Sequence, residues 1–230
     1  MNIRFRFPLI LLISLTLFAL CAPALAYSNE ASGWYTRGNA ELGRGNYSDA
    51  VSAYDQAIAL EPGYFEAWDA KADALNRDGR FSEALEASTR SQEINASYAP
   101  GWINRGQILY NIGYYYEDQM NDLTKANEYY NLQVLTFEKA VTLEPENADA
   151  WFNKGYALAG LKQYDEAIAA FDKVRELNPG YPKLEKNRQI AVQLKDAATP
   201  VYLKYIPVLI GIAAIIIGLV AWFVFLREKE

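Results

Sequence analysis

Four tryptophans in the middle of the chain are spaced as if one length of sequence had been copied. Trp34, Trp68 and Trp102 lie 34 residues apart, and Trp151 follows 49 residues later, which is one period plus 15 residues. A fixed period of about 20 to 50 residues is typical of stacked supersecondary units. Because one such unit cannot bury its apolar face alone, the copies must pack against one another.

Further positions coincide when the chain is aligned on these tryptophans. A small residue follows each tryptophan by four, and alanine, an aromatic and proline recur later in the unit. The aligned sets are Gly38, Ala72, Gly106 and Gly155; Ala50, Ala84 and Ala167; Tyr54, Ser88, Phe137 and Phe171; and Pro62, Pro145 and Pro179. Unit two departs from the pattern with Ser88 for the aromatic and Ala96 for the proline, and unit three has Gln133 for the alanine.

This pattern resembles the tetratricopeptide repeat, W-x₂-L-G-x₂-Y…A-x₃-F…P over about 34 residues. The resemblance covers roughly Ala31 to Tyr181. It implies an all-α fold, a right-handed superhelix of antiparallel helix pairs. The expected units are residues 31–64, 65–98, 99–147 with a 15-residue insertion, and 148–181. Small residues would let paired helices approach closely, and proline would end each second helix.

The two ends of the chain are apolar and indicate membrane passage. Residues 1–26 have Arg4 and Arg6, an uncharged run and a closing Ala-Leu-Ala, the layout of a signal peptide or of an uncleaved anchor. Residues 205–226 would rise about 33 Å as a helix, the hydrocarbon thickness of a bilayer. They are therefore predicted to form one C-terminal transmembrane helix in contact with the lipid bilayer. A buried helix is the alternative for either run.

The remaining boundaries follow from these segments. Residues 182–196 are predicted to form a capping helix, 199–204 a short tether and 227–230 a cytoplasmic tail. Basic residues before the first run and after the second place both ends in the cytoplasm by the positive-inside tendency. The repeat domain, within 27–198, is then extracytoplasmic, in a single-pass cell-membrane protein, or a two-pass one if the signal is kept.

Stacked helix pairs form a curved surface whose concave side is lined by the first helix of each pair. In the resembling family this groove holds a peptide or a partner helix. The corresponding positions in this chain are Tyr35, Asn39, Asp69, Asp73, Arg77, Ile103, Gln107, Tyr110, Phe152 and Tyr156. Tyr35 stands where relatives that grip a terminal carboxylate have lysine, so that type of clamp is not expected.

The charge of the repeat region restricts its partners. Residues 27–198 contain 17 Lys and Arg against 26 Asp and Glu, a net charge of −9. Nucleic acid requires a basic footprint, so it is excluded as a partner. Asp69 and Asp73 are predicted to face a basic or polar segment of a partner protein, or else to form a solvated helix face. Two carboxylates four residues apart are too few for a calcium site, so no metal is expected.

The insertion in unit three is rich in tyrosine. Divided between two helices, 15 residues add about two turns to each. Tyr114, Tyr115, Tyr116, Tyr129 and Tyr130 could form a second contact edge for a partner, or could pack the two arms of the longer hairpin together. Two sequons, at Asn46 and Asn95, fall in predicted turns and are candidate glycosylation sites.

The sequence disfavours catalysis. It has no histidine, and its one cysteine, Cys21, lies in the signal, which removes the commonest general base and most metal ligands. No cofactor motif is present. The predicted function is a membrane-tethered scaffold that binds protein partners or assembles a complex on the extracytoplasmic face. The alternative is a structural cell-surface protein that binds envelope polymer, glycan or surface-layer material.

Overall fold

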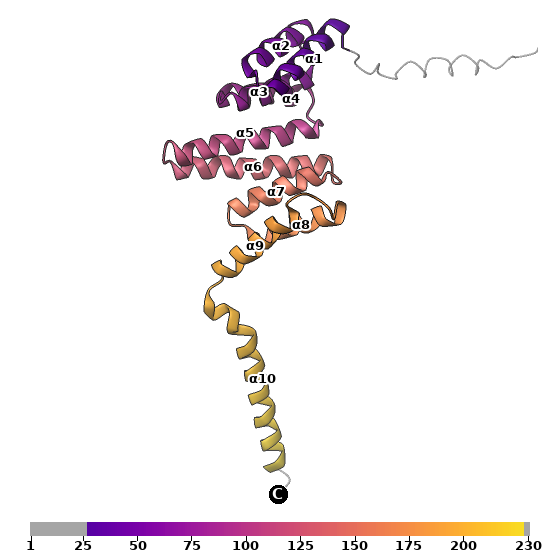
Figure 1. The fold of residues 1–230 in the computed structure, drawn as a ribbon. Helices are drawn as coiled ribbons and strands as arrows, with labels where there is room; N and C mark the ends of the chain where they lie inside the picture. The colour runs from indigo at the N-terminus through magenta and orange to yellow at the C-terminus, as the bar shows by residue number, and fades with distance from the viewer. Residues whose placement is uncertain (1–26, 228–230) are drawn as a thin grey trace, which may run out of the picture.

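The protein is a stack of antiparallel helix pairs followed by one long helix that runs away from the stack (Figure 1). The computed structural model describes residues 27–227, and the side chains of all of these except 201–204, 220 and 223–227. The predicted signal peptide, including Cys21, and residues 228–230 lie outside the described residues. Every regular element within 27–227 is a helix. The prediction of an all-α stack of helix pairs is confirmed.

Each predicted unit contains two helices. They are α1 (Asn29–Arg44) with α2 (Tyr47–Leu60), α3 (Phe65–Arg77) with α4 (Phe81–Ile94), α5 (Ala99–Asp118) with α6 (Leu123–Leu143), and α7 (Ala148–Gly160) with α8 (Tyr164–Leu177). The stack ends with α9 (Leu184–Ala198), and α10 (Val201–Arg227) follows. The pairs lie one below another along the chain, and the α5–α6 hairpin projects beyond its neighbours (Figure 1).

In three of the four pairs, a glycine of the first helix faces an aromatic ring on the second helix; the exception is unit two, which has Ala72 and Ser88 at these positions. A Cβ placed on Gly106 would lie 2.5 Å from the ring of Phe137, which is 1% exposed. Gly38 meets Tyr54 and Gly155 meets Phe171 in the same way. The insertion adds one more such contact, since a Cβ on Gly113 would lie 2.5 Å from the ring of Tyr130. The long hairpin is therefore held together by two interlocked levels instead of one.

The repeated tryptophans join each unit to the turn that precedes it. Trp68 Nε1 donates a hydrogen bond to the carbonyl oxygen of Pro62 at 3.1 Å, and Trp151 Nε1 donates to that of Pro145 at 2.8 Å. Trp102 Nε1 donates to the carbonyl oxygen of Ala96 at 2.9 Å. Because the acceptor is a backbone oxygen, alanine serves there as well as proline, which accounts for the missing proline of unit two.

A second link between neighbouring units recurs with a spacing of 16 residues. A basic residue three positions after each tryptophan contacts a side chain on the second helix of the preceding pair. The contacts are Lys71 with Asp55, 2.6 Å, Arg105 with Thr89, 2.8 Å, and Lys154 with Glu138. The same spacing joins Arg188 of α9 to Asp172 at 2.7 Å. Helix α9 thus occupies the place of a first helix of a fifth unit.

The C-terminal part of the chain differs from the predicted boundaries. Only Thr199 and Pro200 interrupt the helices, so the predicted tether 199–204 is too long and α10 begins at Val201. The reason is that residues 201–204 contain neither glycine nor proline, and the helix extends back to Pro200. So far as the side chains of residues 27–227 are described, no helix is both long enough and apolar enough to cross a membrane.

Candidate functional site

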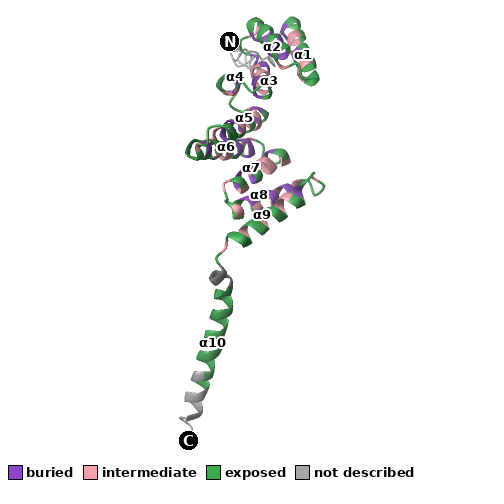
Figure 2. Ribbon diagram, turned by 60° about the vertical axis from the view of Figure 1, so that its left-hand side comes forward, coloured by how far each residue is buried: buried purple, intermediate pink, exposed green. Residues whose placement is uncertain are grey.

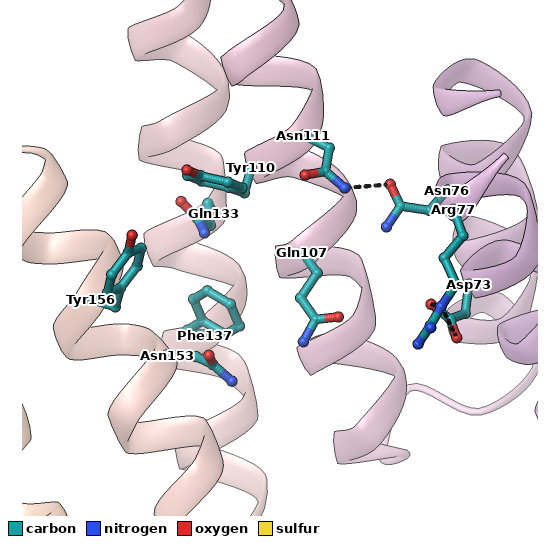
Figure 3. Close-up of a pocket in the computed structure, with 10 residues that line it drawn as sticks. All are labelled: Asp73, Asn76, Arg77, Gln107, Tyr110, Asn111, Gln133, Phe137, Asn153 and Tyr156. Carbon is teal, nitrogen blue, oxygen red and sulfur yellow. Dashed lines mark hydrogen bonds and ion pairs between the residues drawn. The ribbon is translucent and has the colours of Figure 1, made fainter. Parts of the chain in front are cut away.

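The first helices of the central units line two adjoining cavities of the stack, one of which Figure 3 shows in close-up. A cavity of about 350 Å³ lies between α3, α5, α6 and α7, and one of about 590 Å³ adjoins it. The two share Asp73, Arg77, Gln107 and Asn153. We call these two cavities together the concave groove.

Eight of the ten predicted groove residues line this groove. They are Asp69, Asp73 and Arg77 from α3, Ile103, Gln107 and Tyr110 from α5, and Phe152 and Tyr156 from α7. Tyr35 and Asn39 of α1 do not line either cavity. The ring of Tyr35 packs against Tyr54 and Tyr64, and Asn39 Oδ1 accepts a hydrogen bond from the Tyr54 hydroxyl at 2.8 Å. Both therefore support the first unit.

Several groove residues were missed in the sequence. The most informative are four amides, Asn76, Asn104, Asn111 and Asn153. Asn76 and Asn111 lie three and four residues after predicted groove positions, on the same helix faces, so helical spacing could have identified them. Asn153 lies three residues before the predicted Tyr156, so the same spacing could have identified it too.

Three of the four amides join neighbouring units. Asn111 Nδ2 donates a hydrogen bond to Asn76 Oδ1 at 2.9 Å, as Figure 3 shows, and Asn104 Nδ2 donates to Asp69 Oδ1 at 2.9 Å. Gln107 and Asn153 differ from them, since the side-chain amide of neither makes a hydrogen bond to another described residue. Each free side-chain amide has N–H groups that donate and a carbonyl oxygen that accepts, so it can pair with both the C=O and the N–H groups of a peptide backbone.

The two acidic residues are less available than the sequence suggested. Both carboxylate oxygens of Asp73 accept hydrogen bonds from Arg77 Nε, at 3.0 and 3.1 Å. Asp69 is already bonded to Asn104 from the next unit. The predicted acidic pair is thus largely occupied inside the protein. Among the described residues, no group of three or more His, Cys, Asp or Glu could hold a metal ion.

Burial raises the pKa of Asp69 to about 6 from its ordinary value of 3.8, with added repulsion from Asp73 and Glu66. The folded state therefore binds this proton more tightly than the unfolded chain. Between about pH 4 and 6 the free energy of unfolding should fall as the pH rises, because Asp69 loses its proton in a buried site. Above about pH 6 the full destabilisation by the buried carboxylate should be present.

Asp69→Asn should remove this penalty while keeping an oxygen for Asn104. At pH 7.5 we expect the variant to be more stable than the original chain by about 1–3 kcal/mol, and at pH 4 by almost nothing. Urea unfolding at both pH values measures this, with the exposed Asp49→Asn as the control. An equal difference at the two pH values would contradict the assignment.

The insertion tyrosines divide between the two predicted roles. Tyr116 and Tyr129 stack with 5.5 Å between ring centroids, and the Tyr130 hydroxyl donates to Glu117 at 2.7 Å, so these three pack the arms together. Tyr114 and Tyr115 are 52% and 42% exposed and remain free for contact. Asn46 and Asn95 both lie in turns that join helices, where Asn46 is exposed and Asn95 is partly buried.

Comparison with known proteins agrees with this geometry. Residues 35–100 and 148–181 match family models of the tetratricopeptide repeat. The pairs α1–α2, α3–α4 and α7–α8 therefore match the tetratricopeptide repeat. The intervening unit, which carries the insertion, lies almost wholly outside the two matched segments.

Curated relatives are similar over part of the chain. The photosystem I assembly protein Ycf3 of Acaryochloris marina is 28% identical over 127 residues, which are 52% of this chain and 74% of that protein. The STIP1 homolog of Dictyostelium discoideum is 23% identical over 145 residues, 62% of this chain. The matched region spans only 23% of the length of the STIP1 homolog.

Solved structures show the same fold. The MamA RS-1 ArsTM double mutant superposes with a TM-score of 0.60 at 20% identity, covering 74% of this chain and 88% of that one. YrrB, a tetratricopeptide protein with an unusual peptide-binding site, gives a TM-score of 0.55 at 19% identity over 73% of this chain and 79% of its own.

Proposed function

We propose that this chain is a scaffold that holds an extended segment of a partner protein in the concave groove and so assembles a complex. The observation that carries the proposal is the pair of free amides, Gln107 and Asn153, which line both cavities of the groove. An extended peptide has unpaired backbone N–H and C=O groups that such amides can satisfy. Peptide binding in YrrB and the assembly role of Ycf3 support the same class of function.

The proposal does not include catalysis. The sequence has no histidine and a single cysteine, so the usual general bases and nucleophile pairs are missing. The chemistry that the groove offers is hydrogen bonding and apolar contact.

Substitution of both free amides tests the scaffold role. A pulldown with the full chain as bait should recover one or two stoichiometric proteins from detergent-solubilised native membranes. The double substitution Gln107→Ala and Asn153→Ala should weaken the binding of these proteins by about 10- to 30-fold. That loss corresponds to two hydrogen bonds of about 1 kcal/mol each. Gln56→Ala with Asn127→Ala, both exposed on second helices, is the matched control. Equal recovery by both double variants would refute the proposal.

We also propose that α10 anchors the repeat domain to a membrane, with the repeats extracytoplasmic and the C-terminus cytoplasmic. Support comes from the uncharged sequence of residues 205–226 and from the exposure of its apolar side chains. Ile210, Ile215, Ile217 and Trp222 are each more than 60% exposed (Figure 2). Such a surface is unfavourable in water at roughly 25 cal/mol for each Å².

Extraction and protease access test the anchor. The full chain should stay with membranes after an alkaline carbonate wash, whereas a chain that ends at Ala198 should be released. Protease added outside intact cells should digest the repeats. Release of the full chain by carbonate would overturn the anchor, and protection of the repeats would overturn their extracytoplasmic placement.

A further inference from the structure

The concave groove does not end at the last complete unit. A third cavity, of about 430 Å³, adjoins it and shares Tyr110, Gln133 and Tyr156 with it. The other walls come from the projecting part of the α5–α6 hairpin and from α9. We call this cavity the tyrosine pocket, because Tyr110, Tyr114, Tyr130 and Tyr156 line it.

The register of α9 explains why the pocket is apolar. Arg188 corresponds to Lys71, Arg105 and Lys154, so α9 presents to the groove the positions that α3, α5 and α7 present. At two of these positions α9 carries Ile190 and Leu194, where α3 carries Asp73 and Arg77. Ile190 and Leu194 are 41% and 43% exposed and line the pocket. The groove therefore changes from polar amides to apolar side chains at its C-terminal end.

The α5–α6 hairpin forms the wall of the tyrosine pocket opposite α9 and supplies its one carboxylate. Tyr114 projects from the two added turns of α5 and stacks near Tyr110, with ring centroids 6.5 Å apart. Glu117 is the one ionisable carboxylate among the lining residues, and no Lys or Arg lines this pocket. Its Oε2 accepts a hydrogen bond from the Tyr130 hydroxyl, which fixes the carboxylate at the rim.

We infer that the tyrosine pocket binds a bulky apolar side chain of the partner segment, with a lysine or arginine next to it that pairs with Glu117. The inference rests on the proposed function, because the same segment would continue along the amides of the groove. An apolar anchor in an aromatic pocket gains buried area, and a cation beside a fixed carboxylate gains charge complementarity. The net charge of −9 over residues 27–198 favours a basic segment over an acidic one.

A random dodecapeptide library displayed on phage and selected on the full chain tests the inference. Selected peptides should be enriched in Leu, Ile, Met or Phe next to Lys or Arg. Ile190→Ser with Leu194→Ser should reduce the apolar enrichment at least tenfold, and Glu117→Gln should reduce only the preference for the basic residue. Ile94→Ser with Leu60→Ser is the matched control, since these side chains are 43% and 42% exposed and lie on α4 and α2.

The variants separate this inference from the scaffold role. If the amide variants Gln107→Ala and Asn153→Ala abolish selection while the Ile190 and Leu194 variants select the same peptides, the scaffold stands and the pocket inference is overturned. If neither pair changes the selected peptides, both are overturned. Self-association of the full chain that Ile190→Ser and Leu194→Ser abolish would mean that a second copy fills the pocket, which also overturns the inference.

Discussion

Phe137→Ala is expected to lower the free energy of unfolding by about 3–5 kcal/mol, among the largest effects of any single substitution in the stack. The side chain is 1% exposed and its ring closes over Gly106, so its removal leaves a cavity between the paired helices. For a domain of this size the loss corresponds to a fall in the melting temperature of about 6–20 °C. Thermal unfolding followed by circular dichroism measures it.

A double-mutant cycle tests whether the ring and the glycine form one unit. Gly106→Ala alone should cost about 1–3 kcal/mol, because the added methyl group would lie 2.5 Å from the ring. In the Phe137→Ala background this cost should vanish, since the methyl group then enters the cavity. Gly33→Ala is the control, because a Cβ at that helical position meets nothing within 4 Å. Additive costs for the two substitutions would contradict the interlock.

The helix pairs could be predicted from the sequence because the residues that pack them together recur with the same period. A small residue recurs in every first helix, three of the four pairs place it opposite an aromatic ring, and a tryptophan lies near the start of each unit, so the period is visible without a structure. The same logic could have located the second level of the long hairpin. Gly113 follows Gly106 by seven residues and Tyr130 precedes Phe137 by seven, which is two helical turns on each arm.

The groove was only partly predictable, for a physical reason. Alignment identifies which helix faces are concave, but it does not show which side chains already have a hydrogen-bond partner in their own unit or in a neighbouring one. Asn39 and Asp69 stand at groove positions, yet each is bonded to a residue of the protein itself. Asn153 is free in the structure and was not distinguished in the sequence. Hydrogen bonds between units depend on three-dimensional distances that the period does not encode.

The four tyrosines of the pocket were all predicted as contact residues, but their meeting in one cavity with α9 was not, because the walls come from two departures from the repeat. One wall is the insertion, whose tyrosines had two possible roles. The other is α9, whose resemblance to a first helix is carried by the 16-residue spacing from Asp172 to Arg188 rather than by a tryptophan. Within residues 27–227 no second helix pairs with α9 as α8 pairs with α7, so α9 ends the described stack and still extends the groove.

A peptide of residues 65–98, which contains one complete pair, is expected to be largely unfolded at 25 °C, whereas residues 27–198 should be helical and unfold cooperatively. The reason is that the core of this pair is shared with its neighbours. One cluster of buried residues combines Tyr54 of α2, Leu75 of α3, Ala84 of α4 and Ile108 of α5. The isolated pair would expose the apolar surface that α2 and α5 cover, and its two helices are close to the length at which helices alone are marginal.

Far-UV circular dichroism of three lengths measures this dependence on neighbours. Residues 65–98 should give a spectrum close to that of a disordered chain, residues 27–98 should gain partial helicity, and residues 27–198 should show a steep thermal transition. A helical spectrum with a cooperative transition in residues 65–98 would contradict a shared core. The expected order follows from adding interfaces one at a time, because each added pair buries a face of the previous one and leaves only one new face exposed.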